Sequence, residues 1–364
     1  MARKFIISGG GTGGHIFPAI SVADEIRRRE PDADILFVGA DGGMEMNVVP
    51  RYHYPIESVW ISGLHRQLNL RNILRNLSFP FKVITSQFQA SRIISRFRPA
   101  AVVGFGGFAS WPVGQVAGRK RIPLFLCEAN AFPGLVNRRL APKATRILLG
   151  NGDAQKYFDA SKTITTGNPI RSFEVPDKVA AAKSLGLNPD QPILLSLGGS
   201  LGALSLNNAL EGQLDTLMQA DIQLVWQCGK RYYEALVQRV PKHPNLKLMA
   251  FIEDMAAAYG AADLVISRAG GSTISELIEL AKPAILVPSP NVAEDHQTKN
   301  ALSLSEKDAA VLVKDVAAKS QLAAEAIDIL TQPGRLAALQ TGISRMEKHN
   351  SASEIVNEIF QHLN

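Results

Sequence analysis

The sequence predicts an α/β protein with two Rossmann-like, doubly wound parallel-sheet domains that face one another. Short apolar runs alternate with helical patterns along the whole chain, which is typical of parallel sheets covered by helices. A strand, a glycine turn and a helix occur in that order near residue 5 and again near residues 192 and 263. The 364 residues are too many for one small domain and suit two, each able to bury its own core.

The composition indicates a folded protein of a reducing compartment with an anionic partner. Apolar residues make up 46% of the chain and charged residues 20%, which argues against disorder. The net charge of +6 favours nucleic acid, anionic lipid or a phosphorylated substrate, and charge alone does not choose among them. Cys127 and Cys228 are the only cysteines and both lie in apolar runs, which excludes a disulfide framework and a cysteine-rich metal site and indicates the cytoplasm. No apolar stretch is long enough to span a bilayer, so any membrane contact is expected to be peripheral.

The first glycine turn fits two chemistries. A strand leads into the turn at residues 9–15, and a helix follows from about residue 18 to 29. The turn satisfies G-x-G-x-x-G and Asp41 ends the next strand, so the segment mimics a dinucleotide fingerprint and makes a dehydrogenase the rival hypothesis. His15 argues against it, because an imidazole beside phosphate-binding glycines suits a proton acceptor or a diphosphate contact. The alternative is that His15 is an ordinary turn residue at a helix start.

A run without acidic residues, 68–99, predicts a membrane-facing segment. Its apolar side chains are Leu70, Ile73, Leu74, Leu77, Phe79 and Phe81, and its basic ones Arg71, Arg75, Lys82, Arg92, Arg96 and Arg98. Such a segment can enter lipid headgroups and attract anionic lipid. The alternative is a pair of core-facing helices with a solvated basic face.

The alternation then continues to the middle of the chain. Strands are expected at 101–104, 123–127 and 146–149, with turns at 104–108 and 130–134. Residues 165–171 contain Gly and Asn-Pro, which prevent regular structure. We interpret them as a hinge from which Arg171 could reach across a cleft.

The second half repeats the pattern. Strands are expected at 192–197, 222–226, 246–250, 263–267 and 283–288, with glycine turns at 198–202 and 268–271. The glycines at 270 and 271 let the backbone approach a ligand, and the amides at the following helix start offer donors to a phosphate. The polar run 293–300 opens a helix that places Gln297 at the carboxyl edge of the sheet, unless it is an ordinary solvated helix start. Neither half has the spacing of a metal site.

Glu276 has two interpretations. A carboxylate near a helix start can accept both hydroxyls of a ribose. Thr273-x-x-Glu276 also fits a capping box, in which Glu276 satisfies a free backbone amide.

Together these motifs resemble the MurG family, the GT-B glycosyltransferases of peptidoglycan synthesis that add N-acetylglucosamine to lipid I. The resemblance is carried by residues 10–15, 62–64, 104–107, 128–130, 166–171, 198–200, 251–255, 268–276 and 295–297, and it covers nearly the whole chain. It implies the GT-B fold, with a cleft between an acceptor and membrane-association domain at 1–165 and a UDP-sugar donor domain at 166–345. The remaining residues, 346–364, end in an amphipathic helix, and packing back on the N-terminal domain is one placement for it.

The resemblance also implies site residues. On the donor side Glu276 would hold the ribose, the Ile252 backbone would read the uracil and Gln297 would bind the sugar. The diphosphate and its surroundings would fall to Ser200, Gly271, Ser272, Thr273, Ile274 and Ser275. On the acceptor side the resemblance implies Thr12, Gly13, Gly14, Asn130 and Arg171. His15 becomes the candidate base, with Asp41 and Glu128 as other carboxylates that could serve.

The implied activity is an inverting transfer of N-acetylglucosamine from UDP-GlcNAc to the 4-hydroxyl of the N-acetylmuramyl group of undecaprenyl-linked lipid I. It serves cell-wall biogenesis, and so cell shape and division. No metal or other cofactor is expected, because helix starts and amides can stabilise the leaving charge. Nucleic acid is not expected as a partner. The enzyme would sit peripherally on the anionic cytoplasmic face of the bacterial inner membrane.

Three residues depart from the family pattern, namely Cys127, Ala129 and Leu201, and they affect the expected specificity more than the reaction type. The alternatives are another UDP-sugar glycosyltransferase with a lipid acceptor, a dinucleotide-dependent oxidoreductase, and a lipid-binding adaptor without enzymatic activity.

Overall fold

A computed structural model describes residues 2–63, 78–170, 174–199 and 201–363. The chain divides into two compact units, one of residues 1–171 with 349–364 and the other of residues 172–348. The units are called unit 1 and unit 2 below.

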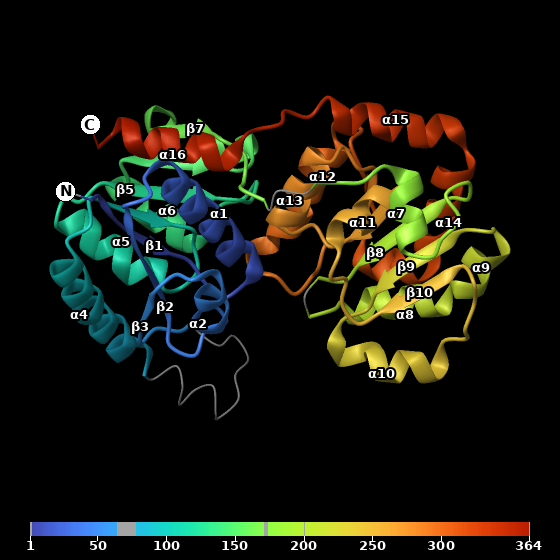
Figure 1. Cartoon of the computed structure of the whole chain (residues 1–364), viewed down its shortest axis with the longest axis horizontal. Coiled ribbons are helices and arrows are strands. Elements are labelled where there is room, and N and C mark those ends of the chain that lie inside the picture. Colours follow the sequence, from blue (N-terminus) through green and yellow to red (C-terminus); the bar gives the residue numbers. More distant parts are fainter. Residues whose placement is uncertain (1, 64–77, 171–173, 200, 364) are drawn as a thin grey trace. The chain divides into compact units, whose positions relative to one another are not determined.

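Unit 1 is built on seven parallel strands in the order β3-β2-β1-β4-β5-β6-β7 (Figure 1). The strands are β1 (Lys4–Ser8), β2 (Asp34–Ala40), β3 (Ile56–Val59), β4 (Ala101–Gly104), β5 (Leu124–Glu128), β6 (Arg146–Leu149) and β7 (Thr163–Thr165). The helices are α1 (Gly13–Arg29), α2 (Glu45–Val48), α4 (Phe79–Phe97), α5 (Ser110–Arg119), α6 (Leu135–Leu140) and α16 (Ser351–Gln361).

Unit 2 is built on six parallel strands in the order β10-β9-β8-β11-β12-β13. The strands are β8 (Ile193–Leu197), β9 (Gln223–Gln227), β10 (Leu246–Met249), β11 (Leu264–Ser267), β12 (Ala284–Leu286) and β13 (Val311–Leu312). The helices are α7 (Lys178–Ser184), α8 (Leu204–Gly212), α9 (Leu214–Gln219), α10 (Lys230–Arg239), α11 (Met255–Ala261), α12 (Gly271–Glu279), α13 (His296–Ser305), α14 (Ala318–Thr331) and α15 (Pro333–Ser344).

Each sheet is covered on both faces, as the alternation of its side chains requires. In β1, Phe5 and Ile7 pack with α1 on one face, whereas Ile6 packs with α4 and α5 on the other. Unit 2 has the same two-sided core, in which fully buried Trp226 lies on one face and Val225 on the other. The predicted fold class of two doubly wound parallel-sheet domains is confirmed.

The C-terminal helix α16 belongs to unit 1. Its apolar residues Ile355, Val356 and Ile359 are buried in the same core as α1, and Figure 1 shows α16, in red, beside α1, in blue. The Phe360 ring lies 6.1 Å from the ring of Phe5 in β1. Among the described residues, no helix combines the length and the apolar character needed to cross a membrane.

Candidate active site

Both units place glycine turns where the order of their strands reverses. In unit 1, β1 pairs with β4, so the turns that follow these two strands lie together. In unit 2 the same holds for β8 and β11. Open α/β sheets bind ligands outside the carboxyl ends of their strands at this switch point. Each unit therefore has one candidate ligand site, and both coincide with turns that the sequence predicts.

The turn after β1 is built around a buried carboxylate that sequence reasoning missed. Glu45 is fully buried and accepts hydrogen bonds from the backbone amides of Gly11 (2.9 Å) and Ala40 (2.8 Å). A side chain at Gly10 would come within 2.1 Å of Glu45 Oε1, so the close approach requires glycine there. A negative charge behind the turn disfavours a second anion at the Gly11 amide. This arrangement argues against a dinucleotide diphosphate in the turn.

His15 lies in the first turn of α1, because the helix begins at Gly13 and not near Pro18, as the sequence suggested. Its Nδ1 lies 2.9 Å from the Gly10 carbonyl oxygen. A carbonyl only accepts, so Nδ1 carries a proton, and in the neutral form of the ring the lone pair is on Nε2. Nε2 faces the turn after β4, since a Cβ added at Gly106 would lie 3.3 Å from it. His15 is thus a helix-start residue, as one interpretation held, and its Nε2 faces the switch point of unit 1, where the predicted role as a proton acceptor or diphosphate contact would need it.

Glu128 holds the loop that carries Asn130. The carboxylate is buried and accepts from the backbone amides of Asn130 and Gly134, each at 3.0 Å. It also accepts from the side-chain amides of Asn130 (3.0 Å) and Asn137 (2.9 Å). Four donors occupy its two oxygens, so Glu128 shapes this loop and is not suited to take a proton from a substrate. Asp41, the other carboxylate considered as a base, is exposed at the end of β2.

We expect Glu128→Gln to destabilise unit 1 by about 2 kcal/mol, the usual cost of losing hydrogen bonds to a charged group. A glutamine of the same shape has one accepting oxygen where the carboxylate has two. Thermal denaturation measures the effect, with Asp41→Asn as the matched control at an exposed carboxylate. Equal melting temperatures for the two variants would contradict the role given to Glu128.

In unit 2 the turn between β11 and α12 presents free amides to a ligand. Gly270 is the N-cap of α12, and the helix starts at Gly271 with no acidic residue in its first turn. The first amides of a helix have no partner within it, and its dipole favours an anion there. Ser272 adds a hydroxyl that has no hydrogen-bond partner among the described residues although solvent does not reach its oxygen. The residues Gly271, Ser272 and Thr273 thus form a helix start whose amides are available to an anion, and Ile274 and Ser275 continue the helix.

The capping-box interpretation of Glu276 is wrong. The helix is capped at Gly270, three residues before Thr273, so Glu276 lies in the second turn. Its Oε2 accepts a hydrogen bond from the Tyr259 hydroxyl at 2.7 Å. Glu276 is half-buried on the helix that carries the anion site. This position is compatible with a ribose next to a bound diphosphate.

The structure describes two further predicted donor residues, Ile252 and Gln297. The side chain of Ile252 is buried in the core, whereas its backbone amide and carbonyl have no hydrogen-bond partner among the described residues. Gln297 Oε1 accepts from the Ser289 amide at 2.8 Å, which directs its NH₂ group to the other side. Arg171 and Ser200 lie outside the described residues, as does the part of the basic, apolar run from Leu68 to Leu77.

Arg268 braces the donor turn, a role that its place in a glycine turn did not reveal. Its Nη1 donates to the Val287 carbonyl (2.9 Å) and to Asp315 Oδ1 (2.6 Å), and its Nη2 donates to Ser205 Oγ (2.5 Å). Buried Asn300 donates from Nδ2 to the Ala269 carbonyl at 3.0 Å. The ends of β11 and β12 and the start of α8 are therefore tied together beneath the anion site.

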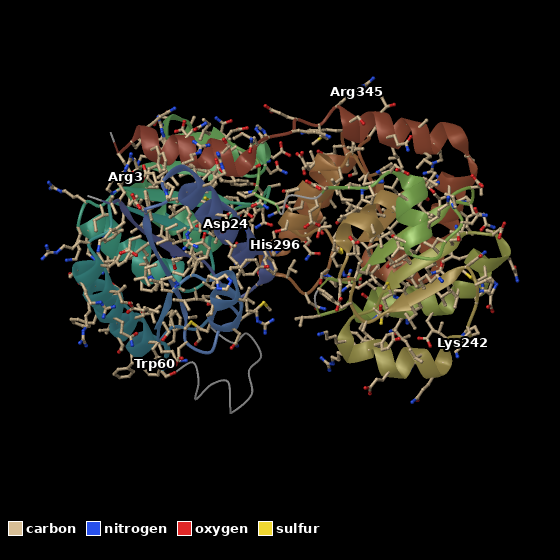
Figure 2. All side chains as sticks on the ribbon, in the orientation of Figure 1. Arg3, Asp24, Trp60, Lys242, His296 and Arg345 are labelled. Atoms are coloured by element: carbon tan, nitrogen blue, oxygen red, sulfur yellow. The ribbon has the colours of Figure 1, made fainter. Side chains whose placement is uncertain are left out.

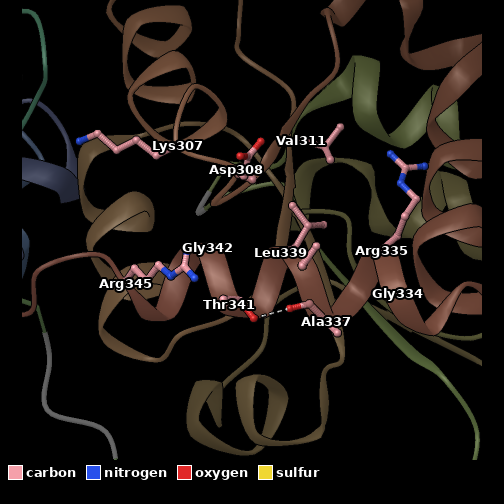
Figure 3. Close-up of a pocket in the computed structure, with 12 residues that line it drawn as sticks. Lys307, Asp308, Val311, Gly334, Arg335, Ala337, Leu339, Thr341, Gly342 and Arg345 are labelled. Atoms are coloured by element: carbon pink, nitrogen blue, oxygen red, sulfur yellow. Dashed lines mark hydrogen bonds between the residues drawn. The ribbon is translucent and has the colours of Figure 1, made fainter.

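A pocket of about 590 Å³ in unit 2 lies apart from these residues (Figure 3). It is lined by Lys307, Asp308, Ala310 and Val311, before and within β13, by residues of α15 between Gly334 and Gly342, and by Arg345 just after that helix. Because residues 307–310 precede β13, this pocket lies at the amino edge of the sheet, opposite the glycine turns. It contains none of the predicted site residues.

Two parallel-sheet units, each with a candidate ligand site at its switch point, are the architecture of nucleotide-sugar glycosyltransferases of the GT-B type. Residues 5–149 match the N-terminal domain of glycosyltransferase family 28, and residues 193–358 match its C-terminal domain. The chain belongs to glycosyltransferase family 28.

Relatives with assigned activities cover nearly the whole chain. The UDP-N-acetylglucosamine–N-acetylmuramyl-(pentapeptide) pyrophosphoryl-undecaprenol N-acetylglucosamine transferase of Phocaeicola vulgatus is 46% identical over 98% of this chain and 96% of its own length. The enzyme of the same name from Cytophaga hutchinsonii is 45% identical, covering 99% and 97%. The crystal structure of Acinetobacter baumannii MurG superposes with a TM-score of 0.78 at 27% identity, covering 99% of both chains.

Proposed function

We propose that the chain transfers N-acetylglucosamine from UDP-GlcNAc to lipid I, undecaprenyl-diphospho-N-acetylmuramyl-pentapeptide, and so produces lipid II for peptidoglycan synthesis. The observation that carries the proposal is the full-length similarity, at 46% identity, to an enzyme named for this transfer. The braced helix start in unit 2 supports it, because a UDP-sugar needs an anion site for its diphosphate.

Donor binding falls to unit 2. The backbone of Ile252 reads the uracil, and Glu276 accepts the ribose hydroxyls. The amides of Gly271, Ser272 and Thr273 hold the diphosphate together with Ser200, and the NH₂ group of Gln297 donates to the sugar. Since these amides face the charge that grows on the departing UDP, they favour the transition state over the bound donor.

Acceptor chemistry falls to unit 1. The 4-hydroxyl oxygen of the N-acetylmuramyl group attacks the anomeric carbon, and the bond from that carbon to the diphosphate oxygen breaks with inversion. His15 Nε2 takes the hydroxyl proton, because its tautomer leaves the lone pair on that atom. Thr12, Gly13, Gly14, Asn130 and Arg171 surround the acceptor.

A coupled assay of UDP release tests the proposal. Release is expected only when UDP-GlcNAc and lipid I are both present. A different UDP-sugar transferase would release UDP faster from another donor. An oxidoreductase would bind NADH tightly and UDP-GlcNAc not at all, and a lipid-binding adaptor would bind vesicles containing lipid I without releasing UDP.

We further propose that α4 docks the enzyme on the anionic cytoplasmic face of the inner membrane. Phe81, Ile84 and Phe88 project from one side of α4 with 68%, 57% and 74% of their surface exposed. Ile93 and Ile94 are buried in the core on the other side of the same helix. A helix that only covered a core would not expose three large apolar residues at a spacing of three and four.

Neighbouring side chains fit the same surface. Trp60, labelled in Figure 2, is 41% exposed, and its backbone amide donates to Gln89 on α4 at 2.7 Å. The Lys82 ammonium lies 5.5 Å from the centre of the Trp60 ring. Tryptophan favours the headgroup level, and the basic residues of α4 attract anionic lipid.

Vesicle sedimentation measures this docking. We expect the double variant Phe81→Ser, Phe88→Ser to bind vesicles of phosphatidylglycerol and phosphatidylethanolamine at least about tenfold more weakly, since burying one phenylalanine is worth about 1.5 to 3 kcal/mol. Val316→Ser, at a side chain that is 87% exposed in unit 2, is the matched control and should bind normally. Binding should fall with salt. Unchanged binding by the double variant would contradict docking through α4.

A further inference from the structure

Tyr259 is a buried side chain whose polar group meets a proposed donor contact. It is fully buried in the core of unit 2, and its hydroxyl donates to Glu276 Oε2 at 2.7 Å. A buried hydroxyl needs a hydrogen-bond partner, and here the partner is the carboxylate of a proposed donor contact. The bond links two helices of the donor site, since Tyr259 lies on α11 and Glu276 on α12.

Helix α11 also begins close to the proposed uracil contact at Ile252. Asp254 caps α11 by accepting from the Ala257 amide at 2.9 Å, and Ile252 lies two residues before this cap. Tyr259 therefore couples the segment at Ile252 to the carboxylate at Glu276 through one short helix. A shift of either element would lengthen the bond between the two side chains.

The Tyr259 hydroxyl remains a donor throughout the working range of pH. Burial raises the pKa of Tyr259 well above its usual value, and the nearby Glu276 charge and the hydrogen bond raise it further. The bond to Oε2 restricts rotation of the carboxylate plane. A carboxylate offers about four lone-pair positions, and the hydroxyl takes one of them. A ribose needs that plane fixed, because its two hydroxyls meet the carboxylate in one geometry.

We propose that Tyr259 is a positioning residue that gives the donor site its selectivity for ribose over 2′-deoxyribose nucleotides. This inference rests on the proposed ribose contact of Glu276. Tyr259 acts through Glu276 and does not touch the donor itself. Its hydroxyl holds the carboxylate so that the 2′-hydroxyl and 3′-hydroxyl are bound together.

Steady-state kinetics of Tyr259→Phe with two donors, UDP-GlcNAc and 2′-deoxy-UDP-GlcNAc, test the inference. Phenylalanine keeps the ring in the core and removes only the hydroxyl. We expect kcat/KM for UDP-GlcNAc to fall about tenfold, the loss typical of one hydrogen bond to a charged group. The value for the deoxy donor should change by less than about twofold, so the ratio of the two falls about tenfold. Tyr233→Phe, at a half-buried tyrosine of α10, is the matched control and should keep the ratio of the original enzyme.

A merely structural role gives a different result, because loss of folded enzyme lowers both values equally and cancels in their ratio. Tyr259→Met, which fills the space with another apolar side chain, replaces the phenylalanine variant if that variant does not fold. An unchanged ratio in either active variant would overturn the inference. An original enzyme that does not distinguish the two donors would overturn it as well, and one that transfers from neither donor would instead refute the proposed function.

Discussion

His15→Ala is expected to lower turnover by a factor of about 100 to 10,000 while leaving the affinity for UDP-GlcNAc nearly unchanged. The bond between Nδ1 and the Gly10 carbonyl leaves the lone pair on Nε2, which is the form a general base requires. His15 belongs to unit 1, and the proposed donor residues that the structure describes belong to unit 2, so removing the imidazole takes away no described donor contact. Steady-state kinetics with both substrates varied measure the effect.

The variant His15→Asn separates the proposed role of His15 as a base from its hydrogen bond to the glycine turn. An asparagine amide can still donate to the Gly10 carbonyl, but it places no basic nitrogen where Nε2 lies. We expect it to be as slow as His15→Ala. Full turnover with a raised Michaelis constant for lipid I would make His15 a diphosphate contact instead. Full turnover with unchanged constants for both substrates would exclude either role.

Glu276→Ala is expected to weaken donor binding by about 2 kcal/mol, or roughly 30-fold, because the charged group proposed to accept the ribose hydroxyls is lost. The variant also leaves the buried Tyr259 hydroxyl without its partner, so the free energy of unfolding should fall by about 1 to 3 kcal/mol. Titration with UDP-GlcNAc measures the first effect, and thermal denaturation measures the second.

Glu279→Ala is the matched control for Glu276→Ala. Glu279 lies three residues further along α12 with an exposed side chain, so the variant removes the same charge from the same helix. Its donor affinity should match that of the original enzyme. If the two variants bound UDP-GlcNAc equally well, the ribose contact assigned to Glu276 would be wrong.

The inner strands of both sheets could be predicted from the sequence, and three edge strands could not. Strands such as β1 and β8 are buried on both faces, so their residues form apolar runs. β3, β7 and β13 each lie at the edge of a sheet, have two to four residues and are only partly buried. Their short, mixed sequences resemble loops.

The candidate site could likewise be predicted only in part. Glycine turns have a local signature, so the sequence located both switch points. Glu45 escaped notice because its partners come from the distant turn at Gly11 and from Ala40, and a charged residue is usually exposed. The spacing Thr273-x-x-Glu276 was misleading, because it does not reveal where the helix begins. The partnership of Tyr259 with Glu276 joins two helices, and no sequence pattern reports such a contact.

Analysis of the lipid product tests the central claim most directly. The protein is incubated with lipid I and UDP-GlcNAc, and the extracted lipid is examined by mass spectrometry and by nuclear magnetic resonance of its anomeric proton. We expect the mass of lipid I to increase by one N-acetylhexosamine residue, joined through a β linkage to the 4-oxygen of the N-acetylmuramyl group. Unmodified lipid I, under conditions in which the protein is folded and binds UDP-GlcNAc, would contradict the proposed transfer, and an α linkage would contradict inversion.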